Sequence, residues 1–188
     1  MDTTTTDEAG ATTETASEVP GPTRVAEQLL YRFEADIQVT PIGLTPEGIR
    51  MTVEFDGTVT DGMLEGARVW GIDPFLMRSD GVGLIDAPKT ISDGDRTVYE
   101  YIRAYLTAPE GLAVPPPEVV LDPGFEWPEV HFPILGFSQF RAGHPDYQHL
   151  NGIQAAVEGS ASFASGRLGI ETRVLRHTGA VAPPAARG

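Results

Sequence analysis

The feature that most constrains the fold is an alternation of apolar and polar residues with a period of two. In YRFEADIQV (residues 31–39), the odd positions are apolar or aromatic and the even positions are polar or charged. This pattern is typical of a β-strand with one buried face. GIRMTVEFDG (48–57) repeats it, and further short runs follow, separated by turns rich in glycine and aspartate. Many short strands without a helical repeat predict an antiparallel β-sandwich or β-barrel.

The chain of 188 residues has the length of one domain. Residues 1–23 have almost no apolar anchor and residues 178–188 form a loose Ala- and Pro-containing end, so we expect disordered tails at both ends. The folded domain is then expected over 24–177. Within it, segment 107–133 carries seven prolines. We interpret this segment either as a rigid surface loop or as a lid over a pocket.

Composition narrows the class of partner. The formal net charge is −14, from 27 acidic and 13 basic residues, which argues against binding to nucleic acid or to an anionic membrane. The absence of cysteine excludes disulfides and zinc–thiolate sites. The N-terminus lacks the features of a signal peptide, and no apolar run has membrane-spanning length, so we expect a cytoplasmic protein. Lys89 is the only lysine, which indicates either GC-rich codon usage or adaptation to a high-salt cytoplasm.

A candidate site follows from the two turns within residues 73–105. If the first turn has two central residues, Asp80 and Gly81, then Ser79 lies opposite Val82. Alternate side chains of the strands before and after the turn then share one face of the sheet. In the next turn, SDGDR (92–96), a central pair Asp93-Gly94 would place Asp86 opposite Tyr101, and a central pair Gly94-Asp95 would place it opposite Arg103. Either register continues the same face onto a third strand, whereas a three-residue loop would invert the parity. The residues brought to one face are Asp73, Phe75, Met77, Val82, Leu84, Asp86, Tyr99, Tyr101, Arg103 and Tyr105.

This face mixes apolar side chains with two carboxylates, an arginine and three tyrosines. A ligand pocket needs such a mixture of apolar walls and a few polar groups. An exposed sheet face with surface tyrosines and a subunit interface are the alternatives. Both faces of the 73–106 meander are apolar, which predicts a homodimer.

The stretch HPDYQHLNG (144–152) predicts a short helical turn near 145–150 and not a metal site. His144 and His149 are five residues apart, which suits neither one helix face nor one strand face, and no third ligand is near in sequence. A proline and an aspartate suit the first turn, and an Asn-Gly pair suits the end. Tyr147 and Asn151 are candidates for the mouth of a pocket.

Several motifs, in the same order, resemble a bacterial family of small β-barrels, the domain-of-unknown-function family 3237. They are FDGTVTDGMLEGARVWG, RSDGVGLID, SDGD followed by VYEY, and FRAGHPDYQHLNG, and the likeness covers roughly residues 30–175. The resemblance implies an allene-oxide-cyclase-like or calycin-like barrel with an open cavity. The matching positions are Asp73, Asp80, Gly81, Asp86, Tyr147, Leu150 and Asn151. Pro74, the pair Phe132-Pro133 and the Pro-rich segment depart from the family pattern, so ligand contacts are expected to differ.

Together these observations predict an all-β protein, an antiparallel barrel of about eight or more short strands that binds a small apolar or aromatic molecule. The first hypothesis is an isomerase, cyclase or lyase that needs no metal or other cofactor, because no nucleotide-binding motif is present. Asp86 or Asp73 would act as general acid or base, Tyr101 would donate to a carbonyl, and Arg103 would stabilise negative charge. The expected ligand-binding residues are Phe75, Met77, Tyr99, Tyr105, Tyr147 and Asn151.

Two hypotheses of other classes stay open. The same face could hold a small apolar ligand without turnover, as in a carrier or sensor. It could instead be an oligomer contact of an assembly protein, which predicts no small-molecule pocket.

Overall fold

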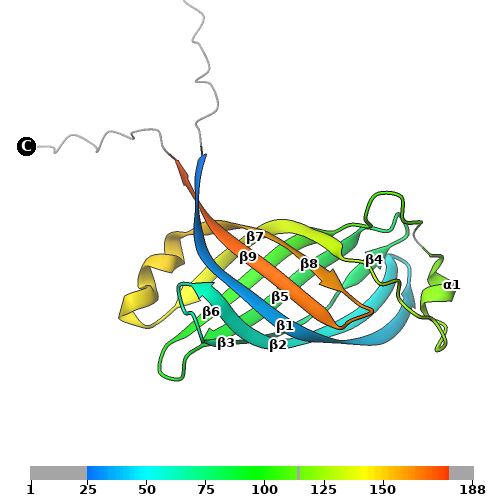
Figure 1. The fold of residues 1–188 in the computed structure, drawn as a ribbon, viewed down its shortest axis with the longest axis horizontal. Coiled ribbons are helices and arrows are strands. Elements are labelled where there is room, and N and C mark those ends of the chain that lie inside the picture. Colours follow the sequence, from blue (N-terminus) through cyan, green and yellow to red (C-terminus); the bar gives the residue numbers. More distant parts are fainter. Residues whose placement is uncertain (1–24, 114, 178–188) are drawn as a thin grey trace, which may run out of the picture.

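The computed structural model describes residues 25–113 and 115–177, and these form one closed antiparallel β-barrel (Figure 1). Around the barrel the strands follow the order β1-β9-β8-β7-β6-β5-β3-β2, and β1 pairs with β2 to close the cylinder. The predicted barrel is therefore confirmed, with eight strand positions around its circumference. The two expected tails, 1–23 and 178–188, lie outside the described residues.

A ninth strand arises because one position is shared by two strands in succession. Both β3 and β4 pair with β2 on one side and with β5 on the other. The strands are β1 Val25–Thr45, β2 Gly48–Gly62, β3 Arg68–Asp73, β4 Leu76–Arg78, β5 Gly83–Ser92, β6 Thr97–Leu106, β7 Phe132–Ala142, β8 Gln154–Ser162 and β9 Arg167–His177.

Alternation of side chains explains why these segments close into a barrel. In β7, buried and exposed residues alternate at each position from Phe132 to Ala142. The buried set fills the barrel interior, since successive side chains of a strand point to opposite faces. The interior of β1 is formed by Tyr31, Phe33 and Ala35, in the parity that its sequence predicts.

A short 3₁₀-helix, η1 (Pro145–Gly152), closes one end of the barrel, at the left of Figure 1. Its Tyr147 and Leu150 are buried in the core. The Asn151 side chain fixes the helix to β7, because its Oδ1 accepts from Ala142 N–H (2.7 Å) and its Nδ2 donates to the Ala142 carbonyl (3.0 Å). The short helical turn expected near 145–150 is confirmed, as a structural plug.

The opposite end is covered by the Pro-rich connection between β6 and β7. It contains the one-turn helix α1 (Pro117–Val120), which lies at the right of Figure 1. Val120 is buried, and Phe125 and Trp127 are half-buried against the core. No helix among the described residues has the length and apolar character needed to cross a membrane.

The loop between β4 and β5 corrects one prediction. Residues 79–81 form this loop, because Arg78 N–H donates to the Val82 carbonyl (3.0 Å). Met77 consequently lies opposite Gly83. The two-residue turn expected from the sequence is wrong, and the third loop residue inverts the side-chain parity between the strands that it joins.

Candidate functional site

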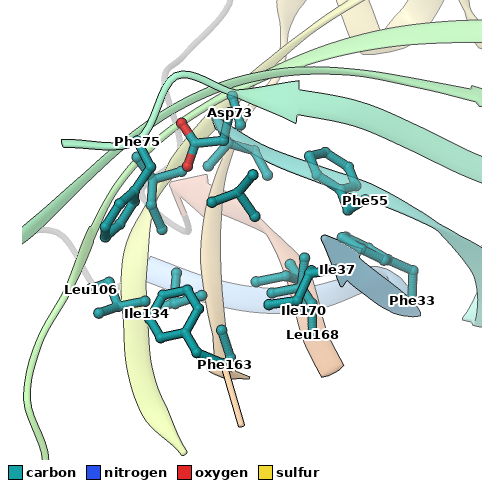
Figure 2. Close-up of a pocket in the computed structure, with 15 residues that line it drawn as sticks. Phe33, Ile37, Phe55, Asp73, Phe75, Leu106, Ile134, Phe163, Leu168 and Ile170 are labelled. Atoms are coloured by element: carbon teal, nitrogen blue, oxygen red, sulfur yellow. The ribbon is translucent and has the colours of Figure 1, made fainter. Parts of the chain in front are cut away.

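A cavity occupies the interior of the barrel at the end covered by the Pro-rich connection (Figure 2). Its volume is about 50 Å³, and fourteen of its fifteen lining residues are apolar. They come from most of the strands and from the β8–β9 turn: Phe33, Ile37, Val53, Phe55, Phe75, Ile85, Ala87, Ile102, Leu106, Ile134, Ala161, Phe163, Leu168 and Ile170. The fifteenth is Asp73.

Asp73 is the last residue of β3, and its carboxylate lies among the apolar side chains of the cavity (Figure 2). It is opposite Val53 on β2, which is also buried. Asp73 itself is 5% exposed. A carboxyl group in such surroundings is costly to ionise, because burial among apolar side chains disfavours the charged form.

The break between β3 and β4 explains how this side chain is held. Pro74 follows Asp73 and has no N–H to donate to a strand ladder. Pairing of β5 with β3 covers Lys89–Ser92, and pairing with β4 covers Gly83 and Leu84, so the intervening residues have no strand partner on that side. In this gap the N–H of Asp86 donates to Oδ1 of Asp73 (3.0 Å). The carboxylate thus replaces the missing backbone acceptor.

The protonation of Asp73 is set by competing effects. The pKa of its carboxyl group is raised to about 7, chiefly by burial, while the hydrogen bond from the Asp86 N–H lowers it and the negative charge of Asp86 adds a smaller increase. At neutral pH both protonation states are therefore populated. Among the described residues this N–H is the only hydrogen-bond donor to the side chain.

Aromatic side chains close the outer end of the cavity. The ring of Phe163 lines the cavity and packs at 6.1 Å from Phe75 and at 4.5 Å from Trp127, measured between ring centroids. Trp127 also meets Phe125 and Phe132 edge to face. The Pro-rich connection therefore contributes the second layer of the cavity's cover, through its single tryptophan.

The inner end of the cavity rests on a buried polar cluster formed by Lys89, Glu100 and Tyr31. Lys89 lies opposite Glu100 in the β5–β6 register, with Nζ 3.3 Å from Oε2, and the Tyr31 hydroxyl donates to the same oxygen. The Lys89 ammonium also lies 4.2 Å from the ring centroid of Phe33, which lines the cavity. The Phe33 ring therefore separates this cluster from the cavity.

Burial controls the chemistry of the cluster. The side chains of Lys89 and Glu100 are fully buried. Burial lowers the pKa of the Lys89 ammonium, although the charge of Glu100 opposes this effect. Burial and the charge of Glu100 raise the pKa of Tyr31 well above its usual range. Sequence reasoning missed this cluster. A signal was present, because Lys89 and Glu100 each lie two residues from a buried apolar residue, Ala87 and Val98, and therefore on the same inward face of the strand.

The residues predicted to form one pocket are divided between the two faces of the barrel wall. Asp73, Phe75 and Met77 point inward, but Met77 does not line the cavity. Asp86 and Arg103 lie opposite each other, which is one of the two registers that the sequence left open, and both are on the predicted common face. That face is the outer one, so the single cavity expected from the sequence does not form.

On the outer face the predicted polar group does assemble. Tyr101 donates a hydrogen bond to Asp86, and Arg103 Nε lies 3.2 Å from the same carboxylate oxygen. Tyr99 and Tyr105 are exposed on this face as well. These residues lie outside the cavity because residues 79–81 form a loop with an odd residue count.

The remaining two candidates, Tyr147 and Asn151, belong to η1 at the other end of the barrel and do not line the cavity. Among residues 25–113 and 115–177, no group of three His, Asp or Glu side chains is arranged to hold a metal ion.

No family model matches the sequence, and no curated protein matches it either. Solved structures with the same fold do exist. A protein of unknown function from Clostridium acetobutylicum is 18% identical, with a TM-score of 0.64 over 81% of this chain and all of that chain. A conserved protein of unknown function from Rhodopseudomonas palustris is 21% identical, with a TM-score of 0.61 over 81% of this chain and 99% of that one.

A β-barrel-like protein from Acinetobacter baumannii is 22% identical, with a TM-score of 0.59 over 85% of this chain and all of that one. At these identities the likeness shows the fold alone. The chain is thus similar to β-barrel proteins whose functions are not described, and the resemblance to family 3237 stays a prediction.

Proposed function

We propose that the protein binds a small, largely apolar molecule inside the barrel and that Asp73 exchanges a proton with it. The observation that carries this proposal is a single carboxyl group, with a pKa of about 7, in a cavity whose other lining residues are all apolar. Strongly shifted acids in apolar cavities are frequent at functional sites. The reaction class that this arrangement supports is an isomerase, cyclase or lyase reaction by acid–base chemistry.

A carboxyl group with a pKa near the ambient pH can both remove and return a proton. In such a reaction Asp73 would take a proton from a carbon next to a ligand carbonyl and return it to a neighbouring atom. The Asp86 N–H would hold Oδ1 in place during both steps, which leaves the second oxygen free to face the ligand.

The roles assigned from the sequence change accordingly. Asp86 acts on the cavity through its backbone N–H, while its carboxylate lies outside with Tyr101 and Arg103. These three side chains have no contact with the cavity and take no part in the proposed proton transfer. Phe75 remains a ligand-binding candidate, because it lines the cavity beside Asp73.

The volume of the cavity limits the size of the ligand. A volume of about 50 Å³ accommodates a few atoms in the present arrangement of side chains. A molecule of one ring therefore requires Phe163 or Trp127 to rotate outward. We also propose that the chain is a member of family 3237. The resemblance implies a barrel with a cavity, and the cavity around Asp73 would be its counterpart in this protein.

A carrier or sensor is the second candidate function. The observation that favours it is that, among the described residues, Asp73 is the only one with a polar side chain that lines the cavity, so one side chain would orient the ligand by a hydrogen bond. Binding without turnover needs nothing more.

Exchange of α-protons of cyclopentanone in D₂O, followed by ¹H NMR, separates these functions. We expect the protein to accelerate exchange and Asp73→Asn to abolish the acceleration. Asp80→Asn, which removes an exposed carboxylate from the 79–81 loop, is the matched control and should exchange like the unmodified protein. Ketone binding without exchange would favour a carrier. The proposal would be contradicted if cyclopentanone showed neither binding nor accelerated exchange and if phenol and benzene did not bind either.

A further inference from the structure

We infer that the outer face of β6 and β7 is the contact surface for a second copy of this chain. The surface is defined by four residues, Arg103 and Tyr105 on β6 and Leu135 and Phe137 on β7, and is called the outer patch below. The inference is independent of the proposed proton transfer, because none of these side chains faces the cavity.

The outer patch exposes an unusual amount of apolar surface. Leu135 is 66% exposed, Phe137 63% and Tyr105 57%. A surface groove of about 760 Å³ runs along them and continues over Leu84 and Ala156 on the neighbouring strands. Contiguous apolar surface of this kind is rare on monomeric proteins and marks a contact site. Aromatic residues and arginine are also the residues that interfaces favour.

The register of the two strands makes the patch complementary to itself. Arg103 lies opposite Phe137, and Tyr105 lies opposite Leu135, so the four side chains form a two-by-two block. A two-fold axis across the strands, in the plane of contact, places Leu135 of one copy on Phe137 of the other. The same operation places Arg103 of one copy on the ring of Tyr105 of the other, which is a favourable cation–π arrangement. Such an isologous contact closes as a dimer.

Charge also favours a second copy at this place. Two chains with a net charge of −14 repel each other over most of their surface. At the outer patch the Arg103 guanidinium offsets the carboxylate of Asp86, with which it is paired at 3.2 Å. Copies that approach through this neutral, aromatic face therefore avoid most of the repulsion and bury the exposed side chains.

The experiment is sedimentation velocity of the full chain at increasing concentration, for the unmodified protein and for two matched variants. Leu135→Lys places a charge in the patch. Ile42→Lys places the same charge on β1, at a residue that is also 66% exposed but lies three strands away from β7 around the barrel. Adding a lysine lowers the net negative charge equally in both, so general repulsion cannot explain a difference between them.

We expect a species of twice the 20.2 kDa chain mass, a dissociation constant raised about 30-fold or more by Leu135→Lys, and no change with Ile42→Lys. Phe137→Ala, which introduces no charge, should weaken the dimer in the same direction, and circular dichroism verifies that each variant is folded. An unmodified protein that stays monomeric at high micromolar concentration would overturn the inference. A dimer that is weakened by Ile42→Lys but not by Leu135→Lys or Phe137→Ala would overturn it as well.

Discussion

Two buried acidic side chains among the described residues, Glu100 and Asp73, lie inside this barrel, and only Glu100 has a cationic partner. Glu100, in the middle of the barrel, is paired with the Lys89 ammonium and accepts a hydrogen bond from Tyr31. Asp73, in the cavity, accepts one backbone N–H and has no cationic partner among the described residues. Both are almost completely removed from solvent.

Burial of an acid in this barrel has two outcomes. Glu100 has a cationic partner, the Lys89 ammonium, whose attraction offsets part of the cost of burying the charge. A buried acid without such a partner has a pKa close to neutral pH and can change state.

The largest effect is expected from removing one partner of the paired carboxylate. Lys89→Met leaves the charge of Glu100 buried without a cation, which should lower the free energy of unfolding by about 5 kcal/mol, the upper end for a broken buried ion pair. Urea unfolding followed by circular dichroism measures this change. The double variant Lys89→Met/Glu100→Leu should recover much of the loss, because no charge then remains. If the double variant is no more stable than the single one, the ion pair is not the cause.

The next effect concerns the pH dependence that Asp73 contributes. Its folded pKa of about 7 is higher than its ordinary value of 3.8, so between these values the folded state keeps a proton that the unfolded state has lost. Stability should therefore fall as pH rises through this window, by up to about 4 kcal/mol, and the loss should be complete above pH 7.

Asp73→Asn removes this dependence, because an amide does not titrate. We expect the variant to be more stable than the unmodified protein above pH 7 and close to it near pH 4, by urea unfolding at a series of pH values. Parallel curves for the two proteins over the whole range would show that Asp73 is ionised in the folded state in the same way as in the unfolded chain.

A smaller effect is expected at the cover of the cavity. Trp127→Ala removes a half-buried ring that packs on Phe163, which should cost roughly 2 kcal/mol of stability, less than a fully buried aromatic. The same change should allow Phe163 to move and increase the affinity for benzene, measured by NMR titration. Trp70→Phe, which alters the other tryptophan on the outer side of β3, is the control and should leave benzene binding unchanged.

The smallest effect is expected at the outer polar group. Arg103→Ala removes an exposed partner of Asp86, and exposed ion pairs contribute little to stability. At a protein concentration low enough for the monomer to dominate, so that a contact between copies does not contribute, we expect no measurable change in the urea midpoint and no change in the binding of cyclopentanone or phenol. A marked loss of ligand affinity would contradict the separation of the outer polar group from the cavity by the barrel wall.

The fold could be predicted from the sequence because apolar and polar residues alternate clearly in strands that have one face exposed to solvent. In β1, charged residues such as Glu34 and Asp36 face outward between buried Phe33 and Ala35, and the parity is unambiguous. The even parity of the next turn was also predictable: four residues, 93–96, join Ser92 to Thr97, and Asp86 lies opposite Arg103.

The site was only partly predictable, for two physical reasons. In β6 both faces look mixed, since Tyr99 and Tyr105 are exposed while Glu100 is buried, so composition alone selects the wrong face. In addition, the loop at residues 79–81 is one residue longer than the turn that Asp-Gly favours, and this inverts the parity of the preceding strand. Asp73 lines the cavity, whereas Asp86 and Arg103, which the sequence pattern grouped with it, lie on the outer face.

The most direct test of the central claim is the titration of Asp73 itself. The chemical shift of its side-chain carboxyl carbon, followed by ¹³C NMR and assigned by comparison with Asp73→Asn, reports its protonation as pH changes. A midpoint near pH 7 is the predicted result, because burial raises the pKa of this carboxyl group to about 7. A midpoint close to the ordinary value of 3.8 would mean that Asp73 is ionised at neutral pH, and the proposed acid–base role of the cavity would be wrong.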